Sequence, residues 1–302
     1  MKPSAADLKS LAVFRAVAEH QGFAGAQTAL NMSPSAISFH IKALEERVGF
    51  VLCRRGRQGF ELTGRGRIAY ERAKAVLASI EDFDNEMGEL RSTAVGTLRL
   101  GLVDNTVSDP DPPMHTVIRE FLRKNARARL DIQIGSPDDL LVAVANGEVQ
   151  LAILPESEQM EGLQSRRLYT ERHSLYCSPD HPLFMRDQTA LSIEEIATYR
   201  FVVRPYANLR ELGSFPGAEV GAHASNMEAQ ALFILSGHFI GMLPDHYASH
   251  WVARQELRAL LPHQLGLDSP FYMVSRSGRR PSLIARNFIQ ELVGQSWEKS
   301  HE

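Results

Sequence analysis

Residues 33–49 are SPSAISFHIKALEERVG, and this stretch decides the fold of the N-terminal part of the chain. Ser33 is a good helix N-cap, and Pro34 occupies the first helical position. Gly49 is typical of the residue that ends a helix. Apolar residues recur at helical spacing and form a buried stripe of Ile37, Ile41, Leu44 and Val48. The outer face of this predicted helix carries Ser35, Ser38, Phe39 and Lys42.

Two further helices are predicted before this one. Residues 4–19 begin with Ser4-Ala5-Ala6-Asp7, which has the spacing of a capping box. After Gly22, a shorter helix with several small residues follows, and Asn31-Met32 turns the chain. Two short helices joined by a tight turn, the second with small polar residues in its first turn, are suited to contact base edges in the major groove of DNA. The pattern therefore predicts a helix-turn-helix.

A β-hairpin is predicted directly after these helices. Residues 51–63 are VLCRRGRQGFELT, in which apolar residues flank a tip rich in arginine and glycine. Gly56 and Gly59 allow positive φ angles at the turn. Such a wing would place Arg54, Arg55 and Arg57 against phosphates or in the minor groove. The alternative is a solvated hairpin of an ordinary small domain.

The charge of the chain is unevenly distributed. Residues 1–67 hold ten Lys or Arg and five Asp or Glu, and because the whole chain carries −3, the remainder carries −8. A basic N-terminal part followed by an acidic remainder indicates that only the N-terminal part contacts a polyanion. On its own this asymmetry is a weak indication, since many proteins have one basic end.

From Leu8 to Gly66 the chain resembles the DNA-binding domain of LysR-type transcriptional regulators. The resemblance rests on Phe14, Ala26, Leu30, Ser33, Ala36-Ile37-Ser38, Ile41, Leu44-Glu45, Gly49, Leu52, Arg55, Leu62-Thr63 and Gly66. The sequence departs from the family at Ala24, Pro34 and Phe39, where the family often has Ser or Thr, Gln, and a polar or basic residue. The residues expected to contact DNA are Ser33, Pro34, Ser35, Ser38, Phe39, Lys42, Arg54, Arg55 and Arg57.

A long helix over residues 64–91, capped by Thr63, is predicted to mediate dimerisation. Its apolar residues recur at alternating spacings of four and three, which is a heptad seam and favours a helical partner. The seam consists of Ala69, Ala73, Val76, Ile80, Phe83, Met87 and Leu90. The resemblance implies a linker-helix dimer, often assembled into a homotetramer. A dimer would bind double-stranded DNA at an inverted repeat.

The rest of the chain is predicted to be an α/β domain after a hinge at residues 92–96. Strands alternate with helices, which favours a parallel sheet with right-handed crossovers. Strands are expected at 97–103, 129–135, 149–154, 173–177, 200–204, 239–243 and 271–275, and helices at 114–124, 137–146, 227–236 and 281–293. The resemblance implies a two-lobed effector domain of the periplasmic-binding-protein type. It covers residues 97–302, with one lobe at 97–170 and 269–302 and the other at 171–268.

A small organic anion is the expected effector, bound beyond the carboxyl ends of the strands. Free amides at helix N-termini, hydroxyl groups and an arginine would suit a carboxylate. The residues in such places are Asn105, Thr106, Gly135, Ser136, Arg204, Tyr206, Ser225 and Asn226. The alternative is that Ser136 and Ser225 are only helix caps and that Arg204 is a structural ion-pair partner.

Other chemistry has little support. His246 and His250 have i, i+4 spacing, but no third metal ligand has clear spacing, so no metal or other cofactor is expected. The only cysteines, Cys53 and Cys177, are interpreted as packing residues. Residues 1–30 lack a signal-peptide pattern, and the apolar stretch 231–243 is too short to cross a membrane.

We therefore expect a cytoplasmic, non-enzymatic transcription regulator that binds DNA and a small effector, and that contacts RNA polymerase if it is an activator. A solute-binding or carrier protein, whose N-terminal helices serve only for dimerisation, is the alternative. An enzyme of small organic acids is a third hypothesis, but no catalytic constellation supports it.

Overall fold

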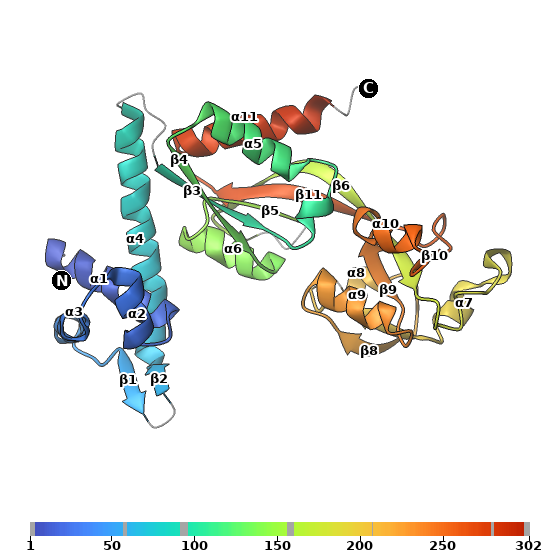
Figure 1. Cartoon of the computed structure of the whole chain (residues 1–302), viewed down its shortest axis with the longest axis horizontal. Helices are drawn as coiled ribbons and strands as arrows, with labels where there is room; N and C mark the ends of the chain where they lie inside the picture. The colour runs from blue at the N-terminus through green and yellow to red at the C-terminus, as the bar shows by residue number, and fades with distance from the viewer. Residues whose placement is uncertain are drawn as a thin grey trace. The chain divides into compact units, whose positions relative to one another are not determined.

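The computed structural model describes residues 4–56, 59–90, 96–155, 160–206, 208–278 and 281–298. It divides into two compact units, Met1–Ser92 with Asn146–Glu148, and Thr93–Ala145 with Val149–Glu302 (Figure 1). In the part of the chain that the structure describes, no helix is long and apolar enough to cross a membrane.

The first unit is a winged helix-turn-helix followed by a long helix. Its elements are α1 (Ala5–Glu19), α2 (Phe23–Leu30), α3 (Pro34–Val48), the antiparallel strands β1 (Cys53–Gly56) and β2 (Gly59–Leu62), and α4 (Gly64–Leu90). The predicted caps are confirmed: Ser4 and Asp7 form a capping box, Ser33 caps α3, and Gly49 ends it in the left-handed region. A core that includes Phe14, Ile37, Leu44 and Leu52 joins the helices to the hairpin.

Thr63 and Gly66 fix the start of α4 against the loop before the hairpin. The Thr63 Oγ1 accepts a hydrogen bond from the Gly66 amide at 2.8 Å and donates one to the Val51 carbonyl at 2.8 Å. A Cβ at Gly66 would lie 1.9 Å from the Leu52 carbonyl oxygen. The close approach therefore requires a glycine at this position.

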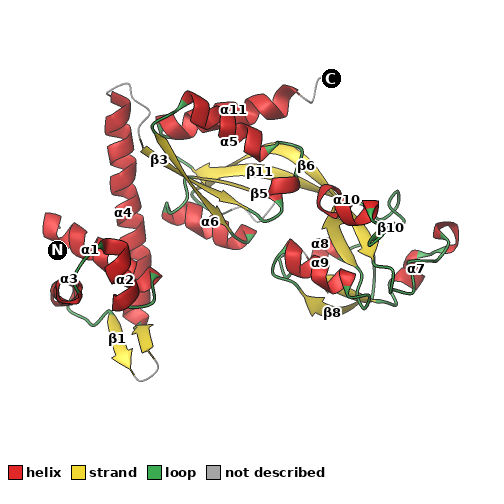
Figure 2. Ribbon diagram, in the orientation of Figure 1, coloured by secondary structure: helices red, strands yellow, loops and turns green. Residues whose placement is uncertain are grey.

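The second unit contains two lobes that share one mixed sheet of seven strands. The strand order is β10-β6-β11-β5-β3-β4, and β9 also pairs with β6. The first lobe contains β3 (Gly96–Leu102), β4 (Ala128–Ile134), β5 (Leu151–Pro155), α5 (Met114–Lys124), α6 (Pro137–Asn146) and α11 (Leu283–Glu298). The helices α5 and α11 lie on one side of its sheet and α6 on the other (Figure 2). They enclose a core that includes Leu98, Phe121, Leu140 and Phe288.

The second lobe is smaller and more irregular. It contains β7 (Arg200–Val203), β8 (Glu219–His223), β9 (Gly241–Pro244), β10 (Arg258–Leu260), α7 (Ile193–Ile196), α8 (Asn208–Glu211), α9 (Met227–Leu235) and α10 (Asp245–Ala253). Two buried clusters lie in this lobe, one with Phe201 and Phe215 and one with Val202 and Ile234.

Two long strands, β6 (Leu163–Cys177) and β11 (Leu267–Arg276), run through both lobes and pair antiparallel along their length. The expected parallel pairing is found for β3–β4, β3–β5 and β7–β8, whereas β11 pairs antiparallel with both β5 and β6, so the sheet is mixed. The strand expected at 173–177 begins ten residues earlier. Its first half carries mainly exposed polar side chains, which hid it from a search for apolar runs.

Candidate DNA-binding surface and effector pocket

The α3 helix presents its polar face to solvent because its apolar stripe is buried. Ile37, Ile41 and Leu44 have relative exposures of 0%, 4% and 2%. The Ser33 Oγ accepts a hydrogen bond from the Ala36 amide at 3.2 Å and lies 3.0 Å from the Ser35 Oγ. The predicted DNA-contacting residues of this segment are all exposed: Ser33, Pro34, Ser35, Ser38, Phe39 and Lys42.

Phe39 is the large apolar residue on this face, and it is 69% exposed. Its ring meets the His40 ring edge-on, with the centroids 5.6 Å apart. His40 is held in turn, because its Nδ1 lies 3.0 Å from the Ser10 Oγ of α1. An exposed aromatic ring beside small polar side chains can make apolar contact with a thymine methyl group.

Ion pairing locks α3 onto α1. The Arg47 guanidinium donates to both carboxylate oxygens of Asp7, with Nε–Oδ1 at 3.0 Å and Nη2–Oδ2 at 2.9 Å. The hydrogen bonds from Arg47 and from Ser4 lower the pKa of Asp7 to about 2. This bidentate pair keeps α3 in register with the rest of the unit.

The wing is partly described. Arg54 is exposed on β1, and it borders a shallow hollow together with Thr63, Gly64 and Arg67 at the first turn of α4. The side chain of Arg55, and the whole of Arg57, lie outside the described residues. Arg67 was not among the predicted contacts, although its place one turn after the Thr63 cap could have indicated it. Glu61 also lines this hollow, so the two arginines beside the helix N-terminus share it with one carboxylate.

The predicted dimer seam does not lie on one free face of α4. Ala73 is 2% exposed and belongs to the core of its own unit, and Ala69 packs against that core. Ala73 is therefore not available to a partner, because α1 and the hairpin already cover this end of the helix, whereas the partly buried Ala69 stays a predicted seam residue. Further along, Val76, Phe83 and Met87 are exposed by 43%, 56% and 36%, and Ile80 is half-buried. The side chain of Leu90 lies outside the described residues.

A pocket lies where the two lobes meet, at the carboxyl end of β3. Three of the eight predicted effector residues border it, namely Asn105, Arg204 and Tyr206. It is also lined by residues that the sequence analysis did not select: Val103, Asp104, Pro155, Glu171, His173, Arg210, Met227, Leu267, Ser269 and Phe271. Asp104 follows the first strand directly, so the rule that selected Asn105 could have found it.

The other five predicted residues do not line this pocket. The buried Thr106 donates its hydroxyl to the Val103 carbonyl at 2.7 Å. The Ser136 Oγ accepts from the Asp139 amide at 3.2 Å, and the Asn226 Oδ1 accepts from the Ala229 amide at 2.8 Å, so both act as helix caps. Gly135 is half-buried beside Leu140, and Ser225 is exposed. For Ser136 the alternative interpretation as a cap therefore describes its contacts.

The pocket lining contains two carboxylates, Asp104 and Glu171, and two guanidinium groups, Arg204 and Arg210. Arg204 is buried and paired with Glu211, with Nε–Oε1 at 2.8 Å. The Asp104 Oδ2 accepts from the Met227 amide at 2.5 Å, and burial raises the pKa of Asp104. Burial also raises the pKa of Glu171, but hydrogen bonds from His173 and His246 outweigh this and lower it to about 2. The pocket therefore has no unpaired buried guanidinium among the described residues to receive an anion.

The histidine pair on α10 does not converge on a shared position. The His246 Nε2 lies 2.9 Å from the Glu171 Oε1, whereas the exposed His250 packs against Trp251, with ring centroids 3.8 Å apart. Cys177 is buried, and burial raises the pKa of its thiol to about 12. At neutral pH this thiol is protonated and a poor nucleophile.

A helix-turn-helix with an exposed polar face, joined to a two-lobed domain with a pocket, defines the class of DNA-binding regulators that sense small molecules. The model of the LysR-family regulatory helix-turn-helix protein matches residues 8–67, and that of the LysR substrate binding domain matches residues 91–297. The chain therefore belongs to the LysR family of transcriptional regulators.

Known proteins similar to this chain agree with that assignment. The transcriptional activator BauR of Pseudomonas aeruginosa is 34% identical over 95% of this chain and 94% of its own length. The SDS degradation transcriptional activation protein of a Pseudomonas species is 28% identical over 92% of this chain and 93% of its own length. The structure of full-length CbnR with its target DNA has a TM-score of 0.66 at 17% identity, covering 95% of this chain and 99% of CbnR. The curated relatives named here are regulators and not enzymes.

Proposed function

We propose that this regulator inserts α3 into the major groove of DNA and changes its DNA binding when a small molecule occupies the pocket between its lobes. The exposed face of α3 is the observation that carries the proposal. A buried apolar stripe and a bidentate ion pair hold the helix in place, while its small polar side chains and Phe39 remain exposed. A pre-oriented helix of this kind fits the groove.

The proposal divides the contacts into two kinds. Ser33, Pro34, Ser35, Ser38, Phe39 and Lys42 would lie at base edges, and Arg54, Arg55 and Arg57 at the sugar-phosphate backbone. The exposed position of Arg54 beside Arg67 supports the proposed contact of the wing with the sugar-phosphate backbone. We add Arg67 to these proposed backbone contacts. Small polar residues with one aromatic residue on the helix, and arginines on the wing, match these different tasks.

A second copy of the chain is the proposed partner of α4. The proposed domain boundaries within each chain are 1–63, 64–91, 92–96 and 97–302. The exposed Val76, Phe83 and Met87 with the half-buried Ile80 support this, because a free helix rarely exposes such a row of apolar side chains. A dimer would bind an inverted repeat, and two dimers would form the tetramer that the family resemblance implies. Such a protein would act in the cytoplasm and, as an activator, would contact RNA polymerase.

The proposed effector is a small organic molecule, and the charges argue against the anion expected from sequence. Asp104 and Glu171 line the pocket, and Glu211 neutralises Arg204, which leaves Arg210 as a positive group of the lining. A neutral or positively charged effector group meets a smaller electrostatic penalty here than a carboxylate.

Salt-dependent DNA binding tests the proposed function. The full chain is titrated into a fluorescent fragment from the DNA upstream of its own gene, and into a scrambled fragment of equal length, at several salt concentrations. We expect tighter binding to the upstream fragment, and affinity for both that falls steeply as salt rises, because counterions are released from the phosphates. Equal affinity for both fragments, or no binding at low salt, would contradict the proposal and favour a solute-binding protein.

A further inference from the structure

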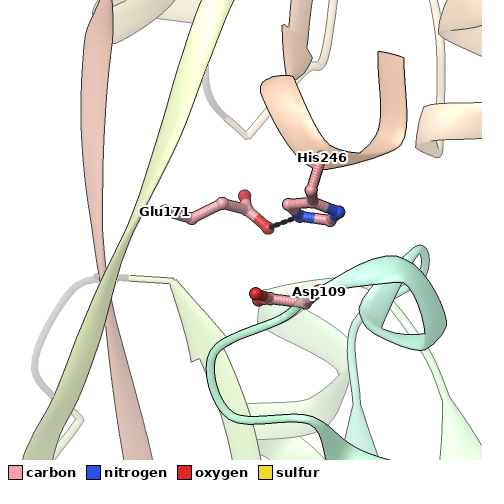
Figure 3. A group of neighbouring side chains, drawn as sticks. All are labelled: Asp109, Glu171 and His246. Carbon is pink, nitrogen blue, oxygen red and sulfur yellow. Dashed lines mark hydrogen bonds and ion pairs between the residues drawn. The ribbon is translucent and has the colours of Figure 1, made fainter. Parts of the chain in front are cut away.

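Three side chains from separate elements of the second unit converge at one point. Asp109 follows the short helix η1 (Thr106–Ser108) of the first lobe, Glu171 lies on β6, and His246 lies on α10 of the second lobe. One potential ligand atom of each lies within 4.8 Å of the other two. Figure 3 shows the Asp109 carboxylate beside the hydrogen-bonded pair of Glu171 and His246. Asp109 and Glu171 are each only 6% exposed.

In each of the three side chains, one polar atom makes a hydrogen bond to a neighbouring residue. The other polar atom faces the remaining two side chains. The His246 Nδ1 lies 3.0 Å from the Ser108 Oγ. The Asp109 Oδ1 accepts from the Asp111 amide at 2.9 Å, and the Glu171 Oε2 lies 2.5 Å from the His173 Nε2. Outer hydrogen bonds that orient a ligand and fix its tautomer are typical of metal sites in proteins.

Two buried carboxylates meet at this site. The Asp109 Oδ2 and the His173 Nδ1 are buried, and neither has a partner at full hydrogen-bond geometry among the described residues, although the Tyr169 hydroxyl interacts with the Asp109 carboxylate. The Asp104 carboxylate interacts unfavourably with Glu171, and the charge of Arg204 is already matched by Glu211. Two buried carboxylates that lie close together repel each other, and a bound cation would reduce that cost.

We propose that Asp109, Glu171 and His246 bind a divalent transition-metal ion such as Zn²⁺. One imidazole nitrogen and two carboxylate oxygens form a ligand set that suits this class of ion, and three protein ligands leave a position for water. An ion bound at the His246 Nε2 would require the ring proton on Nδ1, from which the ring would donate to the Ser108 Oγ. The carboxylate of Asp109 draws in, since metal–ligand distances are about 2.0 to 2.2 Å.

A bare ion fits this site better than the ammonium group of a larger ligand. Of the three residues only Glu171 borders the effector pocket, whereas Asp109 and His246 lie outside its lining. An organic cation needs a path for its carbon chain, but an ion needs only the space between the ligand atoms. Because the ligands come from both lobes and from the strand that joins them, the ion would tie the lobes together.

Zinc titration of the full-length chain tests this site. Protein without an affinity tag is treated with a chelator and desalted. It is then titrated with ZnCl₂ in a calorimeter. We expect saturable binding of one ion per chain and a rise in Tm on zinc addition. Asp109→Asn and His246→Gln should each weaken zinc affinity by about tenfold or more. His250→Gln is the matched control, because this exposed histidine lies one turn further along α10, and its affinity should equal that of wild type.

The outcomes separate this proposal from the proposed function. Wild-type protein that binds no zinc saturably overturns the metal site, whatever its DNA binding. So does zinc binding that Asp109→Asn and His246→Gln leave unchanged, or that only His250→Gln weakens. A variant that fails to fold is recognised by circular dichroism without zinc. The wild-type titration and the other variant then decide the question.

Discussion

Arg204 and Glu211 form a buried ion pair at the wall of the effector pocket. The Glu211 Oε1 accepts from the Nε of Arg204 at 2.8 Å, and its Oε2 accepts from the Arg204 backbone amide at 3.1 Å. Their side chains are 7% and 1% exposed. The Tyr206 hydroxyl lies 3.2 Å from the Arg204 Nη1. Glu211 on α8 thus shapes the pocket wall without being one of its lining residues.

Glu211→Gln should destabilise the second lobe strongly, because it leaves a buried guanidinium without a countercharge. We expect a loss of about 3 to 5 kcal/mol in the free energy of unfolding, measured by urea denaturation. Glu219→Gln is the control, since Glu219 pairs with Arg200 at 3.6 Å on the surface, with side-chain exposures of 70% and 53%. It should cost less than about 1 kcal/mol. Similar small losses in the free energy of unfolding for both variants would contradict a larger contribution of the buried ion pair to stability.

Gly66→Ala should disrupt the junction between the wing and α4. The added Cβ would meet the Leu52 carbonyl oxygen at 1.9 Å, so the backbone must move. We expect a loss of about 1 to 3 kcal/mol, seen as a lower Tm, together with weaker DNA binding. Gly64→Ala, two residues earlier in the same helix, meets nothing within 4 Å and should leave stability within about 1 kcal/mol of wild type. An unchanged Tm for Gly66→Ala would contradict the close approach.

The Asp7–Arg47 pair should make the stability of the first unit depend on pH. The pKa of Asp7 is lowered to about 2 by its hydrogen bonds, from an ordinary value of 3.8. Since a lowered pKa favours the folded state above the unfolded pKa, the stabilisation is complete above about pH 4 and disappears as the pH falls toward 2. The urea midpoint of wild type should therefore exceed that of Asp7→Asn by a constant amount between pH 5 and 7, and by less at pH 3. A difference that grows on acidification would have the wrong sign.

Phe83→Glu should break the proposed dimer while the chain stays folded. Phe83 is 56% exposed on α4, so a charge there costs a single chain little but would be buried in the proposed seam. Sedimentation velocity should show a shift to monomer, with an unchanged circular dichroism spectrum. Ile68→Glu, at another exposed apolar residue of α4 with 66% exposure, lies outside the seam and should sediment as wild type. A Phe83→Glu chain that sediments as wild type would refute the seam.

Local features were predictable from the sequence because their causes are local. The caps Ser33 and Gly49 and the stripe of Ile37, Ile41 and Leu44 follow from neighbouring residues, and the structure has them where expected. The runs of apolar residues also predicted β3 and the alternation of strands and helices in the first lobe. The first half of β6 was missed because its exposed polar residues lack that pattern.

The sites were less predictable because their residues meet only through the tertiary fold. Glu171 and His246 are 75 positions apart, and nothing in the spacing of either predicts their hydrogen bond. Arg204 stood at a strand end as expected, but Glu211 neutralises it from a short helix that the pattern did not show. In the same way, Ala73 fits a heptad seam by spacing, yet the core of its own unit already covers it.

The role of α3 is tested most directly with the variant Ser35→Ala. Its affinity is measured for the upstream fragment and for the scrambled fragment at one salt concentration. Ser35 is exposed in the first turn of α3, and Arg54 on the wing is the control position. We predict that Ser35→Ala loses about 1 to 3 kcal/mol on the upstream fragment alone, whereas Arg54→Ala loses affinity for both. Equal losses of Ser35→Ala on both fragments, or none on either, would contradict base contact by this helix.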